Sequence, residues 1–417
     1  MTELIPVEEA VKIVLDHIEP LPVETVELLQ ATGRVAATDL YSDIDVSAFD
    51  HSAMDGFALK AAQIKQASEQ DPVHLEVIDE IAAGSVFEGS IGQDQCVRIM
   101  TGAPIPADAD AVVKYELVQA ITGEGKTGST VAFSAPTSVG SNIRHAGEEA
   151  KAGECIVTAG EVIKSAGIGF LASCGITEVS TYRRPRVAII CTGSELVDIN
   201  EVPGPGKIRN SNSAALAACV IETGGIPTEL PIVEDTFEAL EQAIVDALPH
   251  HDFIMTTGGA ANGDYDFIKP VAAKLGDVFL TAVNMRPGKA QTFALVQGVP
   301  VFGLPGNPAA AYTGFQMIVR PALRKAQGYT QFQRPMVQAR LSHDVPKRDP
   351  RRIYLRASLE RDEQGYIATP AKNQSSGLFG VLQRTNCLAI MPEGLEDKHA
   401  GDMVDCVLLE VDEGVKL

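Results

Sequence analysis

Hydrophobic positions change their spacing several times along the chain, and each change marks a segment of different expected structure. Near the start, apolar residues recur every three or four positions from Val7 to Ile18, which predicts an amphipathic helix that two following prolines end. From about residue 47 to 141 the pattern consists of short alternating runs separated by turn residues, which predicts a small β-rich domain. Residues 142–180 are rich in glycine and are interpreted as a mixed segment that returns from this domain.

Strand-like and helix-like segments alternate between about residues 186 and 328, which predicts a doubly wound α/β domain. The expected strands are residues 187–190, 229–233, 253–255 and 299–304, and the expected helices are 214–223, 237–248 and 309–327. The tail returns to short strands, such as 352–356 and 404–409, and predicts a small β-barrel or sandwich. The expected domains are therefore 1–46 together with 142–180, 47–141, 181–328 and 329–417.

Length and charge exclude several classes of protein. A chain of 417 residues can form two to four domains, each with its own core. No apolar run approaches the roughly 20 residues of a membrane span, and the first residues do not resemble a signal peptide, so we expect a cytoplasmic protein without a membrane partner. A net charge of −21 argues against a nucleic-acid partner. The spacing of the seven cysteines supports neither a zinc site nor a disulfide framework, and the histidines support no metal site.

Three glycine-rich loops, residues 192–195, 256–266 and 303–308, follow expected strands of the α/β domain. In a parallel sheet they would all lie on the carboxyl edge and converge on one pocket. Glycine lets a phosphate or a pterin approach the backbone, helix-start amides bind anions, and a carboxylate such as Asp266 can hold Mg²⁺. Turn geometry alone is the alternative explanation. Neither a P-loop nor a dinucleotide fingerprint occurs, which disfavours an ordinary kinase or dehydrogenase.

A series of motifs along nearly the whole chain resembles the MoeA-type molybdopterin molybdotransferases, the family that includes the E domain of gephyrin. The motifs are SAMDGFA at 52–58, MTGAPIP at 100–106, DAVV at 110–113, TGSEL at 192–196, SN at 211–212, TGG at 257–259, PGK at 287–289, GLPGNP at 303–308, RIYLR at 352–356 and SSGL at 375–378. The resemblance implies a multidomain α/β and β protein, with a MogA-like central α/β domain, a β-rich N-terminal domain pair and a C-terminal β-barrel. It also implies four domains per subunit and an elongated homodimer.

The same resemblance implies a reaction and its participants. Adenylylated molybdopterin and molybdate would give molybdenum cofactor and AMP, with Mg²⁺ required. The enzyme of the preceding step, a molybdopterin adenylyltransferase, and the molybdoenzymes that receive the cofactor would be possible partners. An anionic substrate that contains a pyrophosphate suits glycine loops and helix-start amides, which agrees with the reading of the residues themselves.

The resemblance implies roles for particular site residues, and several of these residues also have a simpler structural explanation. It implies catalytic roles for Asp266, Glu195, Asp235 and Lys289, with Asp266 and Glu195 as ligands of Mg²⁺. Helix capping or a favourable position in a first helical turn would also explain the three acids. Arg286 and Lys289 flank a Pro-Gly turn, where a guanidinium and an ammonium can hold molybdate or a terminal phosphate, and solvated surface cations are the alternative. The other expected substrate-binding residues are Thr192, Gly193, Ser194, Ser211, Asn212, Gly258, Gly259, Pro305, Gly306, Asn307, Asp55, Thr101, Glu149 and Arg352.

Two of these expectations concern regions outside the α/β domain. The resemblance suggests that Asp55 reaches the pocket of the partner subunit, although an aspartate beside a glycine is also common in turns. Arg352 and Arg356 in the tail are candidates for contacts with the substrate's phosphate, and exposed strand arginines are an equal alternative.

Several positions depart from the family's pattern. Glu149 stands where the family usually has aspartate, and alanines at 260–261 and 309–310 remove two loop hydroxyls. These changes leave a non-catalytic molybdopterin carrier as one alternative. A molybdopterin adenylyltransferase is another, disfavoured because that enzyme lacks the additional β-rich and tail domains. The retained Asp266, Glu195 and Lys289 favour an active transferase.

Overall fold

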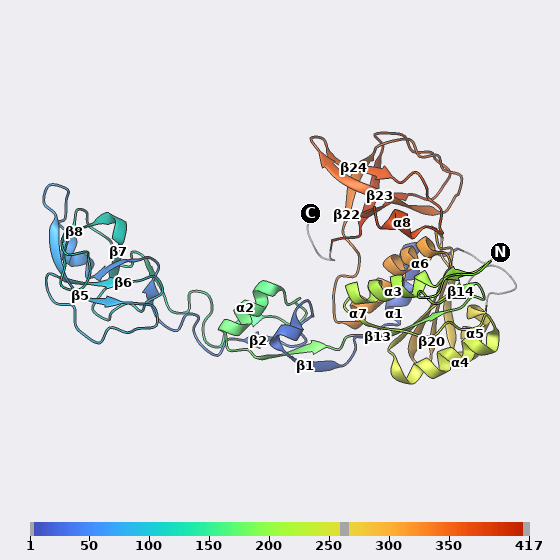
Figure 1. The fold of residues 1–417 in the computed structure, drawn as a ribbon, viewed down its shortest axis with the longest axis horizontal. Helices are drawn as coiled ribbons and strands as arrows, with labels where there is room; N and C mark the ends of the chain where they lie inside the picture. Colours follow the sequence, from blue (N-terminus) through green and yellow to red (C-terminus); the bar gives the residue numbers. More distant parts are fainter. Residues whose placement is uncertain (1–3, 259–266, 412–417) are drawn as a thin grey trace.

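The computed structural model describes residues 4–258 and 267–411. Figure 1 shows an elongated molecule in which a small outer β domain lies at one end and a larger body at the other, joined by a narrow arm. The body contains the α/β domain and a β domain beside it, which lies at the top of that view. No helix among the described residues is long and apolar enough to span a membrane.

The α/β domain is built on a six-stranded sheet with the strand order β16-β13-β17-β21-β20-β18. The strands are β13 (Arg186–Cys191), β16 (Ile226–Glu229), β17 (Phe253–Thr257), β18 (Asp277–Ala282), β20 (Ala290–Val296) and β21 (Val299–Leu304). The first four strands in the order run parallel, and β20 is antiparallel to both of its neighbours. The strand expected at 229–233 instead ends at Glu229, and the sequence analysis did not predict β18 or β20.

Helices cover both faces of this sheet, which confirms the doubly wound domain. They are α3 (Ser211–Glu222), α4 (Phe237–Ala247), α5 (Ile268–Leu275), α6 (Pro308–Gly314) and α7 (Arg320–Ala326), with a π-helical segment (Phe315–Val319) joining the last two. Along β13, Val187, Ile189 and Cys191 belong to the core under α3 and α7, whereas Ala188 and Ile190 belong to the core under α4 and α5. The near-continuous apolar character of β13 follows from this two-sided burial.

The first helix, α1 (Val7–Asp16), packs against the α/β domain and not against the arm with which residues 1–46 were grouped. Its Val7, Ala10 and Val14 are buried in the same core cluster as α3 and α7. Lys325 of α7 donates a hydrogen bond to the carbonyl of Leu15 at 2.8 Å. The apolar stripe predicts an amphipathic helix but does not identify the surface that the stripe covers.

The C-terminal domain is a closed barrel with the strand order β19-β23-β24-β22-β26-β25, in which a further pairing of β23 with β25 completes the closure. Its strands are β19 (Met285–Arg286), β22 (Met336–Leu341), β23 (Arg352–Asp362), β24 (Gly365–Pro370), β25 (Cys387–Met391) and β26 (Met403–Leu408), with α8 (Phe379–Leu382) beside them. Strand β19 comes from the α/β region of the chain and pairs in parallel with β23. The Pro-Gly-Lys turn that follows β19 therefore lies where the two domains of the body meet.

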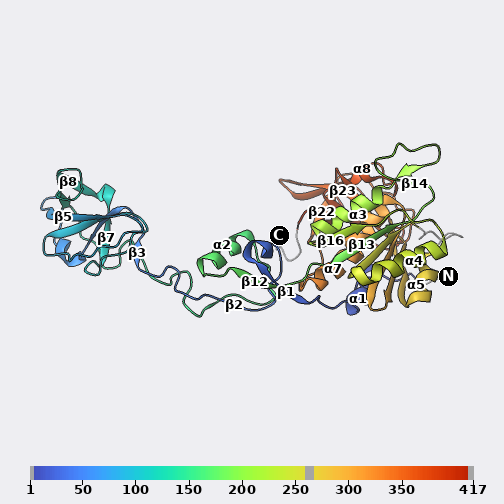
Figure 2. The ribbon, with the colours of Figure 1, turned by 60° about the horizontal axis from the view of Figure 1, so that its bottom comes forward.

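Paired short strands form the arm, and a six-stranded sheet forms the outer domain, with the order β7-β4-β6-β5-β9-β8. The arm pairs are β1 (Val23–Glu27) with β12 (Glu178–Tyr182), β2 (Leu40–Tyr41) with β11 (Cys155–Val157), and β3 (His51–Ser52) with β10 (Ile143–Arg144), beside helix α2 (Ser165–Ser173). The outer strands are β4 (Gly56–Leu59), β5 (Val73–Ile81), β6 (Gln95–Ile99), β7 (Ala111–Lys114), β8 (Val118–Thr122) and β9 (Thr130–Phe133). Figure 2 shows the same arm and outer domain from a second direction.

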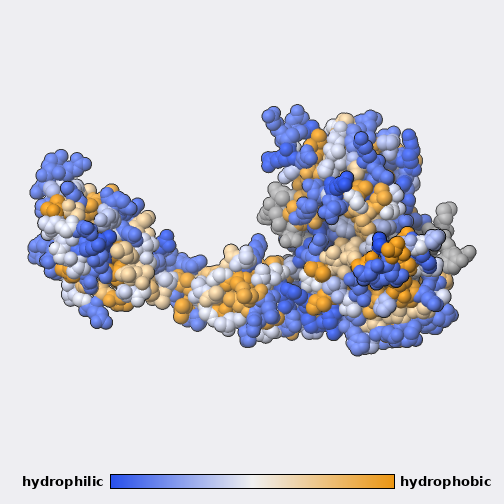
Figure 3. Space-filling model, in the orientation of Figure 1, coloured by the Kyte–Doolittle hydropathy of each residue, from blue (hydrophilic) through white to orange (hydrophobic). Residues whose placement is uncertain are grey.

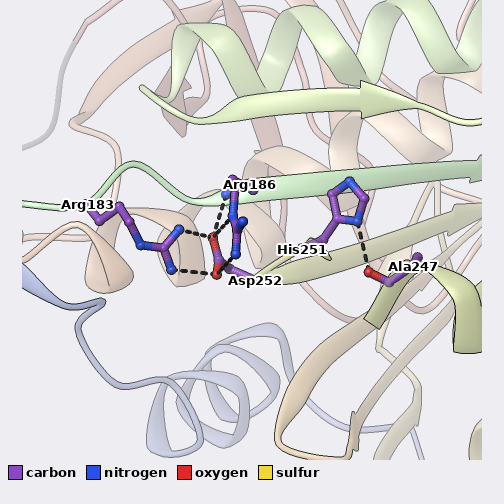
Figure 4. A network of polar contacts seen from close by, with 5 residues as sticks. All are labelled: Arg183, Arg186, Ala247, His251 and Asp252. Atoms are coloured by element: carbon purple, nitrogen blue, oxygen red, sulfur yellow. Dashed lines mark hydrogen bonds and ion pairs between the residues drawn. The ribbon is translucent and has the colours of Figure 1, made fainter. Parts of the chain in front are cut away.

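A network of ion pairs marks the point where the arm joins the body (Figure 4). The partly buried carboxylate of Asp252, just before β17, accepts hydrogen bonds from Arg183 Nη1 at 2.7 Å and Nη2 at 2.6 Å. It also accepts one from the backbone N–H of Arg186 at 2.8 Å. Arg183 directly follows β12 of the arm and Arg186 begins β13, so one carboxylate connects the arm to the sheet.

Candidate functional site at the carboxyl edge of the sheet

The three glycine-rich loops meet at the carboxyl edge of the parallel strands, as the sequence predicts. The backbone N–H of Thr192 donates to the carbonyl of Thr257 at 3.0 Å, and the Thr257 hydroxyl donates to the carbonyl of Pro305 at 3.0 Å. The side-chain amide of Asn212, in the first turn of α3, donates to Thr257 Oγ1 at 2.9 Å and to the carbonyl of Gly306 at 2.8 Å. These bonds hold the three loops and the start of α3 in one arrangement.

Glycine is required where these loops touch. Gly258 has φ = +96°, and a Cβ at this position would lie 2.0 Å from the carbonyl oxygen of Thr192. A Cβ on Gly306 would lie 3.4 Å from the Cα of Gly258. The backbones of the loops are therefore in direct contact at Gly258, which leaves no room for a side chain there.

The first of two cavities at this edge has a volume of about 60 Å³ and lies between these loops and the start of α3. Its lining includes the predicted residues Thr192, Glu195, Ser211, Asn212, Gly258 and Gly306. Asn210 caps α3, because its side chain accepts a hydrogen bond from the backbone N–H of Ser213 at 3.2 Å. The predicted Gly193 and Ser194 lie in the first loop, and the Ser194 carbonyl accepts a hydrogen bond from Lys207 at 2.5 Å.

Two carboxylates, Glu195 and Asp235, lie near each other beside this cavity. Burial and the negative charge of Glu195 raise the pKa of Asp235, and the Thr192 hydroxyl offsets part of that effect. The buried atoms Asp235 Oδ1, Asn212 Oδ1 and Thr256 Oγ1 have no hydrogen-bond partner among the described residues. Two neighbouring acids and unpaired oxygens are chemically suited to a hard cation. Asp266 and Gly259 lie outside the described residues, and among residues 4–258 and 267–411 no cluster of three metal-ligating side chains occurs.

The second cavity is larger, about 870 Å³, and lies between the α/β domain and the barrel. The predicted residues Arg286, Lys289, Pro305, Gly306 and Asn307 line it. Its basic lining residues are Arg286, Lys289, Arg348, Arg351, Arg356 and Lys372. Among the described lining residues only Asp344 is acidic, so this cavity is strongly positive in a chain that is acidic overall.

Arg356 is the most unusual of these cations because only 1% of its surface is exposed. Burial, together with the positive charge of Arg286, lowers the pKa of the Arg356 guanidinium to about 10. Its Nη2 donates to the carbonyl of Ser375 at 3.1 Å, whereas its Nε has no hydrogen-bond partner and none of the described carboxylates pairs with it. A buried, protonated guanidinium with no carboxylate partner is favourable only where an anion can approach it.

The remaining predicted residues lie elsewhere in the chain. Arg352 forms ion pairs with Glu8 and Glu393 and does not line the larger cavity. Asp55, which precedes β4, accepts hydrogen bonds from the backbone N–H of Thr101 at 2.8 Å and from its hydroxyl at 2.7 Å, and these bonds lower the pKa of Asp55. Glu149 is exposed, beside the arm's β10. Within one chain, Asp55, Thr101 and Glu149 are not among the residues that line either cavity.

Sequence reasoning missed three basic residues of the larger cavity, Arg348, Arg351 and Lys372. They come from loops of the barrel, and the pairing of β19 with β23 and of β23 with β24 brings these loops to the Pro-Gly-Lys turn. The segment KRDPRR at 347–352 is a local signal that could have found two of them, because it is strongly basic in an acidic chain.

The fold and the cavities define a multidomain α/β protein with a cationic cavity between its α/β domain and its barrel. Residues 5–175 match the MoeA N-terminal region (domains I and II), residues 188–325 match a probable molybdopterin-binding domain, and residues 338–409 match the MoeA C-terminal region (domain IV). The chain is 36% identical to molybdopterin molybdenumtransferase of Staphylococcus aureus strain COL, over 98% of this chain and 96% of that protein. It is 38% identical to the protein of the same name from Bacillus subtilis strain 168, over 98% and 95% of the two chains.

A crystal structure of the molybdopterin biosynthesis MoeA protein from Pyrococcus horikoshii superposes with a TM-score of 0.81 at 31% identity, covering 98% of this chain and all of that one. The chain therefore belongs to the MoeA family.

Proposed function

We propose that this protein is a molybdopterin molybdotransferase that converts adenylylated molybdopterin and molybdate into molybdenum cofactor and AMP. The observation that carries the proposal is that Gly306 lines both cavities. A substrate held by the glycine-rich loops would therefore reach directly into the cationic cavity where an oxyanion would bind. The names of the S. aureus and B. subtilis relatives support the same reaction class.

Molybdate would occupy the cationic cavity. It is a tetrahedral dianion, and Arg286, Lys289 and Arg356 present N–H donors from the α/β domain and from the barrel. Guanidinium groups bind such oxygens as forks and an ammonium acts as a point charge, so the set both attracts and orients the oxyanion. An anion beside Arg356 would also supply the partner that its buried guanidinium lacks.

The adenylylated pterin would lie along the carboxyl edge of the sheet. Ser211 and Asn212 begin α3, a 12-residue helix whose N-terminal end lines the smaller cavity, so that its first backbone amides would bind the phosphates of the substrate. The contact at Gly258 removes side chains from the floor of this site, so that the substrate can approach the backbone.

The acids beside the smaller cavity fit Mg²⁺. Glu195 and Asp235 would hold the ion, and Asp266 would join them. When bound, Mg²⁺ would neutralise charge on the phosphate oxygens as the phosphoanhydride breaks. Its charge would also reverse the effect of Glu195 on Asp235, since a cation between two acids favours their ionised forms.

A second copy of the chain would complete the site. Asp55, Thr101 and Glu149 lie in the outer domain and arm, and the arm of a partner subunit would bring them to the body. The support is the apolar surface along the arm in Figure 3, where the exposed residues include Leu29, Tyr41, Ile44, Phe49 and Val162. Surfaces of this kind commonly mark protein interfaces.

The test is AMP release from adenylylated molybdopterin, measured with and without molybdate and Mg²⁺. The wild type is compared with Lys289→Ala and Asp266→Ala, and with Lys274→Ala on the exposed face of α5 as the matched lysine control. Release that needs both ions, falls strongly in the first two variants and persists in the control supports the proposal. Binding of the nucleotide without any release of AMP would instead favour the non-catalytic carrier.

A further inference from the structure

Asp349 connects two arginines of the cationic cavity. Its carboxylate accepts hydrogen bonds from Arg351 Nε at 2.9 Å and from Arg351 Nη2 at 2.5 Å, which is a bidentate pair. The same carboxylate accepts a hydrogen bond from Arg286 Nη1 at 3.2 Å. Arg286 belongs to β19, at the edge of the α/β domain, whereas Arg351 directly precedes β23 of the barrel.

Asp349 contacts the arginines but does not line the cavity in which the ligand would bind. Both arginines line the larger cavity, but Asp349 is not among the described residues of that lining. Its side chain is only 12% exposed, while that of Arg286 is 53% exposed. The carboxylate therefore contacts two arginines of the cavity lining without itself lining the cavity.

Repulsion among the cations makes such an anchor necessary. Arg286, Arg351 and Arg356 face one cavity, and the charge of Arg286 is large enough to lower the pKa of Arg356. Without a carboxylate, the largely exposed Arg286 side chain would be free to turn into solvent, away from the other cations. Arg351 has a second restraint, because its Nη1 donates to the carbonyl of Met285 at 3.3 Å. Of the two arginines, Arg286 therefore depends more strongly on the carboxylate of Asp349 for its position.

We propose that Asp349 is a positioning residue for the oxyanion cavity, which fixes Arg286 and Arg351 so that their remaining N–H groups face the bound anion. This proposal rests on the proposed function, since it assumes that the cavity binds molybdate. An outer carboxylate of this kind fixes the orientation of a ligating group, and its loss typically weakens binding although the ligating group itself remains.

The experiment compares three variants by isothermal titration with sodium molybdate and by steady-state AMP release at varied molybdate. Asp349→Asn removes the anchor, and we expect its dissociation constant and KM for molybdate to rise about tenfold while kcat changes little. Asp344→Asn is the matched control, because it removes the same charge from an acid of the cavity lining that pairs with His399 and not with an arginine. It should bind molybdate at least as tightly as the wild type. Asp349→Glu restores the charge and should recover part of the affinity.

A fourth variant, Arg351→Lys, keeps every charge but cannot form the bidentate pair, and it carries the test if Asp349→Asn does not fold. The positioning role is supported if Asp349→Asn and Arg351→Lys bind molybdate more weakly than the wild type, whereas Asp344→Asn does not. Equal or tighter binding in Asp349→Asn, or wild-type binding in Arg351→Lys, overturns it. A wild type that binds no molybdate refutes the proposed function itself, and the two failures are therefore distinct.

Discussion

Replacing Arg356 with methionine should stabilise the ligand-free protein while it removes the response to molybdate. Arg356 is buried, and burial lowers its pKa to about 10, which corresponds to about 3 kcal/mol of unfavourable free energy for the charged form in the folded state. Because the folded pKa of this base is lowered, the penalty is fully present below a pH of about 10 and is lost progressively as the pH rises from there toward the higher pKa of the unfolded chain. Methionine retains most of the side chain's length without the charge.

The expected magnitude combines two opposing contributions. Removing the charge stabilises the folded state, because the unfavourable free energy just described disappears. Losing the hydrogen bond to the Ser375 carbonyl destabilises it by about 1 kcal/mol. We therefore expect the free energy of unfolding of Arg356→Met to be higher than that of the wild type by about 1–2 kcal/mol at neutral pH. Without the guanidinium, the KM for molybdate should rise by at least about tenfold, as for the loss of a charged hydrogen bond.

Urea unfolding with and without molybdate tests both halves of this prediction. For the wild type, molybdate at about 100 times its dissociation constant should add about 2.7 kcal/mol of stability. For Arg356→Met that increment should largely disappear. A variant that is clearly less stable than the wild type, yet is still stabilised by molybdate, would refute the reasoning, because Arg356 would then be a structural residue.

Three further predictions concern the loops, the arm and the partner subunit. Gly258→Ala should lower stability by about 2–4 kcal/mol and abolish AMP release, because its Cβ would overlap the Thr192 carbonyl in a backbone conformation with positive φ; thermal unfolding and the activity assay measure both effects, and wild-type values would contradict the described contact. Asp252→Asn should lower stability by about 1–2 kcal/mol at neutral pH, since the variant loses a partly buried, bidentate ion pair. The pKa of Asp252 is lowered in the folded state, so its contribution to stability is present above the unfolded pKa and is lost as the pH falls through the folded pKa. The variant should accordingly lose less stability on acidification than the wild type. An unchanged dependence of stability on acid pH would argue against the role of this ion pair. Asp55→Asn and Lys289→Ala should each be inactive alone, but mixed dimers should regain part of the activity if one subunit's arm completes the other's site; no recovery in verified mixed dimers would contradict the shared site.

Local pattern was sufficient for the elements that position the glycine loops. The apolar run of β13 and the periodicity of α4 predict their type within a residue or two. The antiparallel pair of β18 and β20 was missed, although these strands are at least as long as β13, since a buried apolar run has no period that separates a strand from a buried helix. The stripe of α1 predicted a helix but could not identify the core in which it is buried, because packing partners are set by tertiary structure.

The residues of the cationic cavity were likewise only partly predictable from the sequence. Lys289 and Arg286 could be found because they flank a Pro-Gly turn in one short motif. Arg351 and Lys372 could not be assigned, because they come from separate barrel loops that the long-range pairing of β19 with β23 and of β23 with β24 brings to that turn. The pattern of β23 also does not tell Arg352 from Arg356, and the structure places the first in ion pairs with Glu8 and Glu393 and the second in the cavity.

The transfer of molybdenum itself is the decisive quantity. The measurement is the molybdenum content of the pterin product, by mass spectrometry, against the AMP released in the same reaction, for the wild type and for Lys289→Ala. If the protein is a molybdotransferase with its oxyanion site in the cationic cavity, each AMP released by the wild type accompanies one molybdenum atom in the product, and both quantities fall together in the variant. Release of AMP without molybdenum in the pterin, or full molybdenum incorporation by Lys289→Ala, would contradict the proposed function and the placement of its oxyanion site.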